Sequence, residues 1–231
     1  MLIATTIAVK GLKDAGMEVY RHLAAGDLPA ARRSLGMIVG RETSHLDEPE
    51  IVRGTVETVA ENIVDAVISP LLYALIGGPA GHGLPRRKYP RFDGRLQKRK
   101  IHSPRLGFGP AGRHRQLDSG KIDALLLTVS AFILRMNGRR AWRTMRRDAR
   151  KHPSPNSGFP ESTVAGALGI RLGGVNVYHG VESFRAYMGD ALRRMESRDI
   201  LLANRLLLTV SVLFVLLALL AVWAAGGALW T

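Results

Sequence analysis

The sequence predicts an all-α, multi-helix integral membrane protein that is interrupted by an irregular basic insert. Leu206–Gly226 contains no charged residue and is long enough, as a helix, to cross a hydrocarbon core of about 30 Å. Apolar residues recur at helical spacing between Ile51 and Val67. The charge of +14 is uneven, because residues 84–123 hold twelve of the 33 Lys and Arg residues but three of the 19 acidic residues.

The apolar run near the C-terminus predicts a transmembrane helix within the segment 200–231. A buried helix in a soluble core is the alternative, but such helices seldom run this long without a charge. Arg193, Arg194, Arg198 and Arg205 precede the run, whereas the tail after it has no basic residue. The positive-inside rule therefore places the N-terminal side in the cytoplasm and makes membrane lipid a partner.

The first eighty residues predict further helices. Met1–Val9 resembles the tail of a helix that is cut by the start of the chain, so we expect an N-terminally truncated protein. Asp27 is a candidate N-cap and Pro29 stands in the first turn of a short helix that we expect to end at Gly40. Pro49 marks the start of the next helix.

One face of this second helix carries an acidic stripe, in which Glu57, Glu61 and Asp65 recur every four residues. Stacked carboxylates repel one another unless a cation lies among them. The stripe therefore suggests a site for Mg²⁺ or for a Mg²⁺-nucleotide, built from hard oxygen ligands. A solvated acidic face is the simpler interpretation of the same spacing.

Residues 150–174 differ in kind from the helical segments. The prolines and small polar residues of 152–161 predict a rigid loop, and Pro160 with Glu161 then begins a helix of small residues. A helix N-terminus there would favour a phosphate or a carboxylate. The chain has no phosphate-binding loop or Rossmann glycine pattern, and without cysteine it has no disulfide, thiolate metal site or cysteine nucleophile.

Several blocks carry a family resemblance: GLKDAGMEVY, GDLPAARRSLGMIVGRET, VETVAENIVDAVISPLLY and HPSPNSGFPESTVAGALGIRLGG, in this order. Together they resemble the adenosylcobinamide-phosphate synthase family of cobalamin biosynthesis. The resemblance implies a multi-pass enzyme of the cell membrane with cytoplasmic catalytic loops. It also implies an amide synthesis that depends on ATP and Mg²⁺ and joins adenosylcobyric acid, a corrinoid, to aminopropanol or its phosphate. The alternative is a non-catalytic membrane remnant or an AmpE-like membrane sensor.

The resemblance also assigns candidate roles. Arg41, Thr43 and Ser154 become candidates for binding the nucleotide or corrinoid, and Glu61 and Asp65 for binding the metal. A helix-terminal cap is the simpler role for Arg41 and Thr43, and His152 has a structural interpretation. The candidate catalytic residues are Glu57, Glu61, Asn62, Asn156 and Glu161.

Four parts are expected along the chain: a helical part over 1–80, an irregular segment over 81–123, a helical part with the proline-rich loop over 124–199, and the membrane helix with its tail over 200–231. A nucleic-acid-binding arm would interleave stacking aromatics with its basic residues, and few stand in the basic segment. We therefore expect no nucleic acid partner.

The basic segment has an explanation in the genetic code. Asp93 and Gly94 must be encoded GAY GGN, and reading one nucleotide later gives AYG, a codon for Met or Thr. Read in this way, Lys88 to Gln97 is compatible at each position with the NTLDSMVGYK segment of the family that the chain resembles. We therefore expect residues 84–123 to be out of frame and to form poorly packed coil.

Resequencing the gene across the codons for Gly81 to Ala124 tests this expectation. Two compensating insertions or deletions should bracket the segment, and correcting them should restore the NTLDSMVGYK sequence. An uninterrupted frame that still encodes KYPRFDGRLQ would contradict it.

Overall fold

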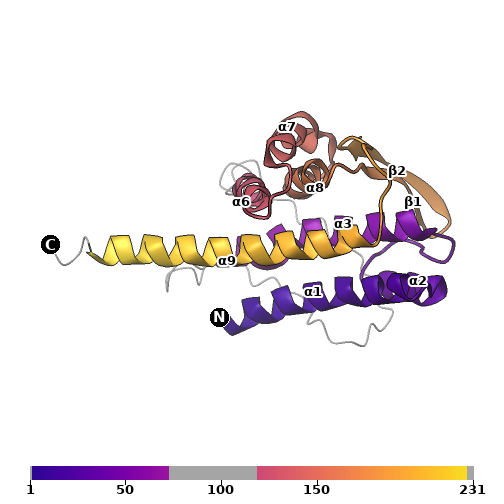
Figure 1. Ribbon diagram of the computed structural model, residues 1–231, viewed down its shortest axis with the longest axis horizontal. Helices are drawn as coiled ribbons and strands as arrows, with labels where there is room; N and C mark the ends of the chain where they lie inside the picture. The colour runs from indigo at the N-terminus through magenta and orange to yellow at the C-terminus, as the bar shows by residue number, and fades with distance from the viewer. Residues whose placement is uncertain (1, 73–118, 228–231) are drawn as a thin grey trace, which may run out of the picture.

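The computed structural model describes residues 2–72 and 119–227 (Figure 1). Helices dominate, but β1 and β2 form a two-stranded antiparallel sheet, so the all-α expectation is wrong in this detail. The elements are α1 Leu2–Ala24, α2 Leu28–Gly36, α3 Glu48–Ile63, the π-helical turn η1 Val64–Ile68, α6 Ser119–Ile133, α7 Gly138–Asp148, the 3-10 turn η3 Ala149–Lys151, α8 Pro155–Leu168, β1 Leu172–Tyr178, β2 Val181–Met188 and α9 Arg198–Gly227.

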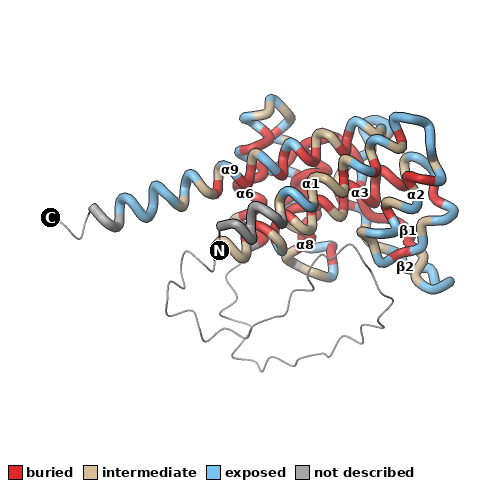
Figure 2. The backbone as a smooth tube through the Cα atoms, turned by 90° about the horizontal axis from the view of Figure 1, so that it is seen from below, coloured by how far each residue is buried: buried red, intermediate tan, exposed pale blue. Residues whose placement is uncertain are grey.

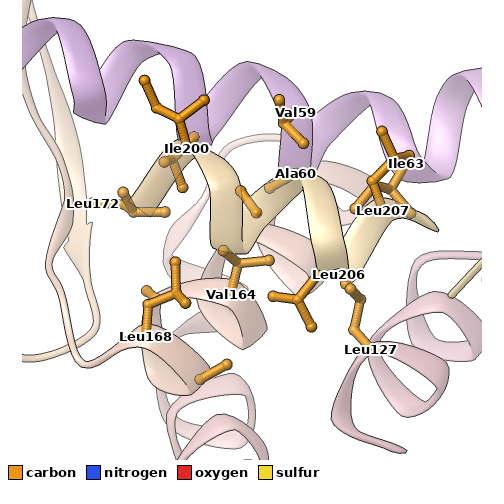
Figure 3. Close-up of a cluster of buried hydrophobic side chains, with 14 of the residues drawn as sticks. Val59, Ala60, Ile63, Leu127, Val164, Leu168, Leu172, Ile200, Leu206 and Leu207 are labelled. Carbon is orange, nitrogen blue, oxygen red and sulfur yellow. The ribbon is translucent and has the colours of Figure 1, made fainter. Parts of the chain in front are cut away.

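Helix α9 is the axis of the bundle. Figure 1 shows α1 on one side of it and α6, α7 and α8 on the other, and α3 contacts α1, α8 and α9. Apolar side chains from four helices and β1 meet between α3, α8 and α9 (Figure 3). Their burial away from water supplies the main driving force for this packing. The labelled members are Val59, Ala60, Ile63, Leu127, Val164, Leu168, Leu172, Ile200, Leu206 and Leu207.

The two halves of α9 have different surroundings. Ile200, Leu207 and Val210 are fully buried in the core, whereas Leu220 and Trp223 are exposed, and Figure 2 shows the C-terminal half projecting from the bundle. Within the described residues, Arg198–Ala224 is the one helix long and apolar enough to cross a membrane. This span overlaps the predicted transmembrane helix; the multi-pass arrangement stays a prediction.

Three of the described helix starts have side-chain caps. Asp27 Oδ1 accepts a hydrogen bond from the Ala30 N–H at 2.9 Å, as predicted. Asp47 caps α3 through the Glu50 N–H at 3.0 Å, and Asn137 caps α7 through the Arg140 N–H at 2.9 Å. Helix α2 ends at Gly36, earlier than the predicted Gly40. Thr43 Oγ1 donates to the Arg32 carbonyl in the last turn, so the following chain folds back over the helix end.

The segment 152–161 is largely helical, contrary to the expected loop. Helix α8 begins at Pro155 rather than at Pro160. Proline suits the first helical position because its missing N–H has no intrahelical partner there. Pro160 lies inside the helix and leaves the Asn156 carbonyl without its usual partner.

The expectation of coil over residues 84–123 can be compared with the structure only at the start of α6. Helix α6 begins at Ser119, so residues 119–123 of the expected irregular segment are helical. Residues 84–118 lie outside the described residues, so the expectation of coil there stays a prediction.

The β1–β2 hairpin was not predicted. Tyr178 pairs with Val181, and the two residues between them, His179 and Gly180, have φ values of 52° and 78°. Positive φ at both central positions is the requirement of the type I′ turn that joins twisted strands. Asparagine and glycine are the usual signal for this turn, and histidine in the first position obscured it.

Gly166 is the close-packing point between α7 and α8. A Cβ added there would lie 2.8 Å from the Ala141 Cα and from the Arg140 carbonyl oxygen. Gly166→Ala should therefore lower the free energy of unfolding by about 1–3 kcal/mol, measured by denaturant unfolding in detergent. Gly11→Ala is the matched control, since nothing lies within 4 Å of its added Cβ, and it should be neutral or stabilising.

Candidate functional site

Glu57 is the centre of a buried polar network between α3 and β1. Its carboxylate accepts hydrogen bonds from Arg41 Nη2 at 2.7 Å and from the Gly173 N–H at 2.9 Å. Arg53 Nη1 lies 3.8 Å away. Both carboxylate oxygens are therefore satisfied, although the residue is 3% exposed.

The two arginines extend this network to β1. Arg41 also donates to Asn176 Oδ1. Arg53 donates to the Gly173 and Val175 carbonyls at 2.5 and 3.0 Å and pairs with Glu50 at 2.7 Å. The guanidinium groups thus fix the first strand to α3 by charge-assisted hydrogen bonds.

Glu61, one turn further along α3, faces the N-terminal part of α8. Ser157 Oγ donates to Glu61 Oε1 at 3.0 Å and lies 3.2 Å from Ser154 Oγ. The acidic stripe and the SPNSGFPE segment are therefore in direct contact.

Glu161 is the least satisfied member of the site. It is 1% exposed, and within the described part of the chain neither carboxylate oxygen has a hydrogen-bond partner. Burial raises the pKa of Glu161 well above its ordinary value, and the carboxylates of Glu57 and Glu61 raise it further. Both effects favour the protonated form of the acid over the ionised form.

His152 lies beside this acid. Its Nδ1 lies 3.0 Å from the Ser154 backbone nitrogen and 2.9 Å from the Ser154 carbonyl oxygen, so the ring is held against the start of α8. Nε2 lies 3.6 Å from Glu161 Oε1, longer than a hydrogen bond. A small shift of either side chain would bring Nε2 into hydrogen-bonding distance of the carboxyl group.

The remaining candidates lie around or away from this cluster. Asn62 Nδ2 donates to the Thr58 carbonyl at 2.8 Å within α3, and Thr43 binds the end of α2. Asn156 is half-buried, and its backbone packs against Gly120 of α6. Asp65 is exposed in the π-helical turn that follows α3.

Four contributing residues were missed from the sequence: Arg53, Ser157, Asn176 and Arg185. The positive charge of Arg185 acts on Glu161, whose pKa it lowers against the larger effect of burial. Arg53 precedes Glu57 by four residues, and Ser157 lies between Ser154 and Glu161 at helical spacing. Arg53 could have been predicted by extending the acidic stripe by one turn toward the N-terminus. Ser157 could have been predicted by treating the proline-rich segment as a helix. Asn176 and Arg185 belong to the unpredicted hairpin.

A groove of about 730 Å³ adjoins this network. Arg41 and Arg53 contribute to both, and the groove is also lined by His45, Arg171 and Arg194. Arg53 Nε and Asn176 Nδ2 are buried donors without a partner among the described residues. Because Glu42, Asp47, Glu50 and Glu182 also line the groove, it offers both charged donors and carboxylate acceptors to a polar ligand.

The carboxylates of the site offer Mg²⁺ a limited set of ligands. No group of three or more His, Asp or Glu residues suited to a metal occurs within 2–72 and 119–227. Mg²⁺ commonly takes one or two carboxylates and completes its shell with water and substrate phosphates. Glu61, with the unpartnered Glu161 beside it, fits that limited contribution.

The fold and the site define a helical protein with one candidate membrane span among its described residues and a cluster of carboxylates beside a groove lined by arginines and acidic residues. The family described as CobD/Cbib protein matches residues 1–87 and 120–207, and the chain belongs to this family.

Named relatives agree with the family assignment. The chain is 40% identical over 219 residues to the cobalamin biosynthesis protein CobD of Leptospira interrogans serogroup Icterohaemorrhagiae serovar copenhageni, covering 92% of this chain and 68% of the relative. It is 41% identical to CobD of Geobacter metallireducens, with 93% and 68% covered. It is 39% identical to CobD of Klebsiella pneumoniae, covering 98% of this chain and 72% of the relative. No solved structure matches.

Glu161 makes stability depend on pH. Its folded-state pKa lies above the ordinary 4.5, so the folded protein binds this proton more tightly than the unfolded chain does. Its stabilising contribution is complete below pH 4.5 and is lost as the pH rises toward the folded pKa. Glu161→Gln, which cannot ionise, should therefore increase stability at neutral pH, as measured by denaturant unfolding across the acidic to neutral range.

Glu48→Gln is the control for this measurement, since Glu48 is exposed on the first turn of α3. It should leave the pH profile nearly unchanged. Equal profiles for the native chain and Glu161→Gln would show that Glu161 ionises normally.

Proposed function

We propose that this chain, once its reading frame is corrected, catalyses ATP-dependent amide formation between adenosylcobyric acid and aminopropanol or its phosphate, giving adenosylcobinamide or its phosphate. Membership of the CobD/Cbib family supports a role in cobalamin biosynthesis. The observation that carries the chemical proposal is the buried contact between the α3 carboxylates and the SPNSGFPE segment of α8.

Amide formation requires a base at the amine. The nitrogen attacks only as a free amine, and the proton that it loses must pass to an acceptor. In the proposed role, the ionised form of Glu161 accepts this proton, because its raised pKa makes it a stronger base than an ordinary carboxylate. Glu61, fixed by Ser157, orients the amine by accepting a hydrogen bond from it.

Activation of the corrinoid carboxylate is the second requirement. ATP supplies the phosphoryl group that makes a carboxylate oxygen a leaving group, and the amine then displaces phosphate. Glu61 and, within the same proposal, Asp65 would hold Mg²⁺ on the phosphates. Arg41 and Arg53 at the groove would neutralise anionic groups of the bound substrates.

The setting of the proposed reaction is the cell membrane. Helix α9 anchors the site, and the arginines before it favour a cytoplasmic position for the catalytic loops. The further spans of a multi-pass enzyme are part of this proposal.

A non-catalytic membrane remnant or an AmpE-like regulatory protein is the second candidate. The family match omits residues 88–119, within the segment for which we expect a shifted frame. A chain without the corresponding family segment would lack polar groups needed for positioning, where a misplacement of about 1 Å can cost roughly a hundredfold in rate.

Growth rescue distinguishes these candidates. We expect the printed chain to fail to restore corrinoid-dependent growth in a strain without its own synthase, and a frame-corrected version with its upstream coding region to succeed. In that version, Glu61→Gln or Asn156→Ala should lower synthase activity by about a hundredfold or more. Activity is measured as corrinoid amide formed by membranes that contain equal amounts of protein.

Glu48→Gln serves as the matched carboxylate control and should retain full activity, since its side chain is outside the cluster. If the printed chain restores growth, the expectation that the shifted frame has inactivated this chain is wrong. Failure of the corrected version would count against the synthase assignment itself.

A further inference from the structure

Helix α6 has an apolar face that the protein does not cover in the described structure. Its opposite face contributes Leu127 and Ala131 to the core. The uncovered residues recur at helical spacing and are 38–57% exposed: Leu125, Val129, Phe132 and Ile133. A continuous exposed apolar face of this kind marks a contact surface rather than scattered surface residues.

The next helix adds positive charge beside that face. Helix α7 packs against α6, and Phe132 lies against Gly138 at its start. The exposed face of α7 carries a tryptophan that is 40% exposed, together with three arginines that have no acidic partner among the described residues. These residues are Arg139, Trp142, Arg143 and Arg146, and Arg150 follows in η3.

The position of α6 relative to α9 indicates that a membrane could cover the apolar face of α6. Figure 1 shows α6 nearly end-on while α9 runs along the long axis, and α6 packs against α9 near the point where α9 leaves the bundle. The exposed apolar half of α9 lies beyond this point (Figure 2). A membrane crossed by α9 would therefore reach α6 and run roughly along its axis.

We propose that α6 and α7 form a docking surface for the anionic headgroup layer of the membrane. The apolar face of α6 enters the boundary between headgroups and acyl chains, and the arginines of α7 contact lipid phosphates. Trp142 occupies the interface, where an apolar ring with one polar group is favoured. The proposal rests on α9 spanning the membrane, but it does not require the synthase reaction.

Charge complementarity selects lipid over a protein segment as the occupant. A protein segment that covers α6 needs only apolar groups. Such a segment would leave the row of unpaired arginines on the adjoining helix without partners. An anionic lipid surface satisfies both faces, since basic residues near it gain affinity and apolar residues enter the boundary.

Fluorescence of single-tryptophan variants tests this surface. The full chain, with Trp223→Phe and Trp230→Phe, is reconstituted in nanodiscs of equal phosphatidylglycerol and phosphatidylcholine or of phosphatidylcholine alone. Trp142 should be quenched by lipids brominated near the headgroup in the anionic discs. Removing Arg143 and Arg146 as Arg143→Gln and Arg146→Gln should weaken docking about fivefold for each arginine, with a matching loss of quenching.

Two controls separate docking from insertion. Arg21→Gln with Arg33→Gln removes exposed arginines of α1 and α2 and should leave the quenching of Trp142 unchanged. A variant that retains Trp223 alone reports on α9 and should be quenched by lipids brominated deep in the chain, in both compositions.

Three outcomes would overturn the proposal. Trp142 exposed to aqueous acrylamide and unquenched by bromolipid would place α7 away from the membrane. Trp142 shielded from both quenchers would mean that protein covers the surface. Quenching that is equal in neutral lipid and insensitive to Arg143→Gln with Arg146→Gln would remove the role of the anionic headgroups.

Discussion

The buried carboxylate of Glu57 is the interaction on which the arrangement of the site depends. Removing an ion pair from water is costly, and the cost is offset only when each charged atom finds partners in good geometry. Glu57 achieves this with Arg41 from the segment after α2 and with the Gly173 N–H of β1. Because these partners are distant in sequence, satisfying one carboxylate brings the α2–α3 connection, α3 and the hairpin together. The groove that shares Arg41 and Arg53 follows from the same contacts.

Glu57 and Glu161 are buried to a similar degree but have opposite electrostatic surroundings. Glu57 has two arginines and a backbone N–H around it, whereas Glu161 has two neighbouring carboxylates and no hydrogen-bond partner in the described residues. The difference separates their places in the structure. Glu57 holds the contacts between α3 and β1 together, whereas the carboxyl group of Glu161 takes part in none of them. The bonds that stabilise the fold make no use of the group proposed to be reactive.

The sequence contained most of the helical framework and part of the site. Asp27 was predictable as an N-cap from its position just before Pro29, and the structure has this cap. The start of α8 was placed too late because a proline was taken as the end of a loop, although Pro155 occupies the first turn and Pro160 lies within the helix. Local patterns could not reveal the contact of Glu61 with Ser157 or that of Asn176 with Arg41, since these join residues 96 and 135 apart along the chain. The π-helical turn that contains Asp65 was likewise not predicted, since the stripe assumed uniform helix geometry.

Helix α9 links the site to the proposed membrane position. Its N-terminal half contributes Ile200 and Leu207 to the core that also holds α8, the helix of Glu161, while its C-terminal half leaves the bundle. A continuous helix rises 1.5 Å per residue, so contacts in the first half fix the height of the second. Glu161 and the candidate membrane span therefore cannot shift independently without disrupting the core. In the proposed membrane position, the site would be held at a constant distance from the bilayer, on the side where arginines precede the span and where we propose that ATP reaches it.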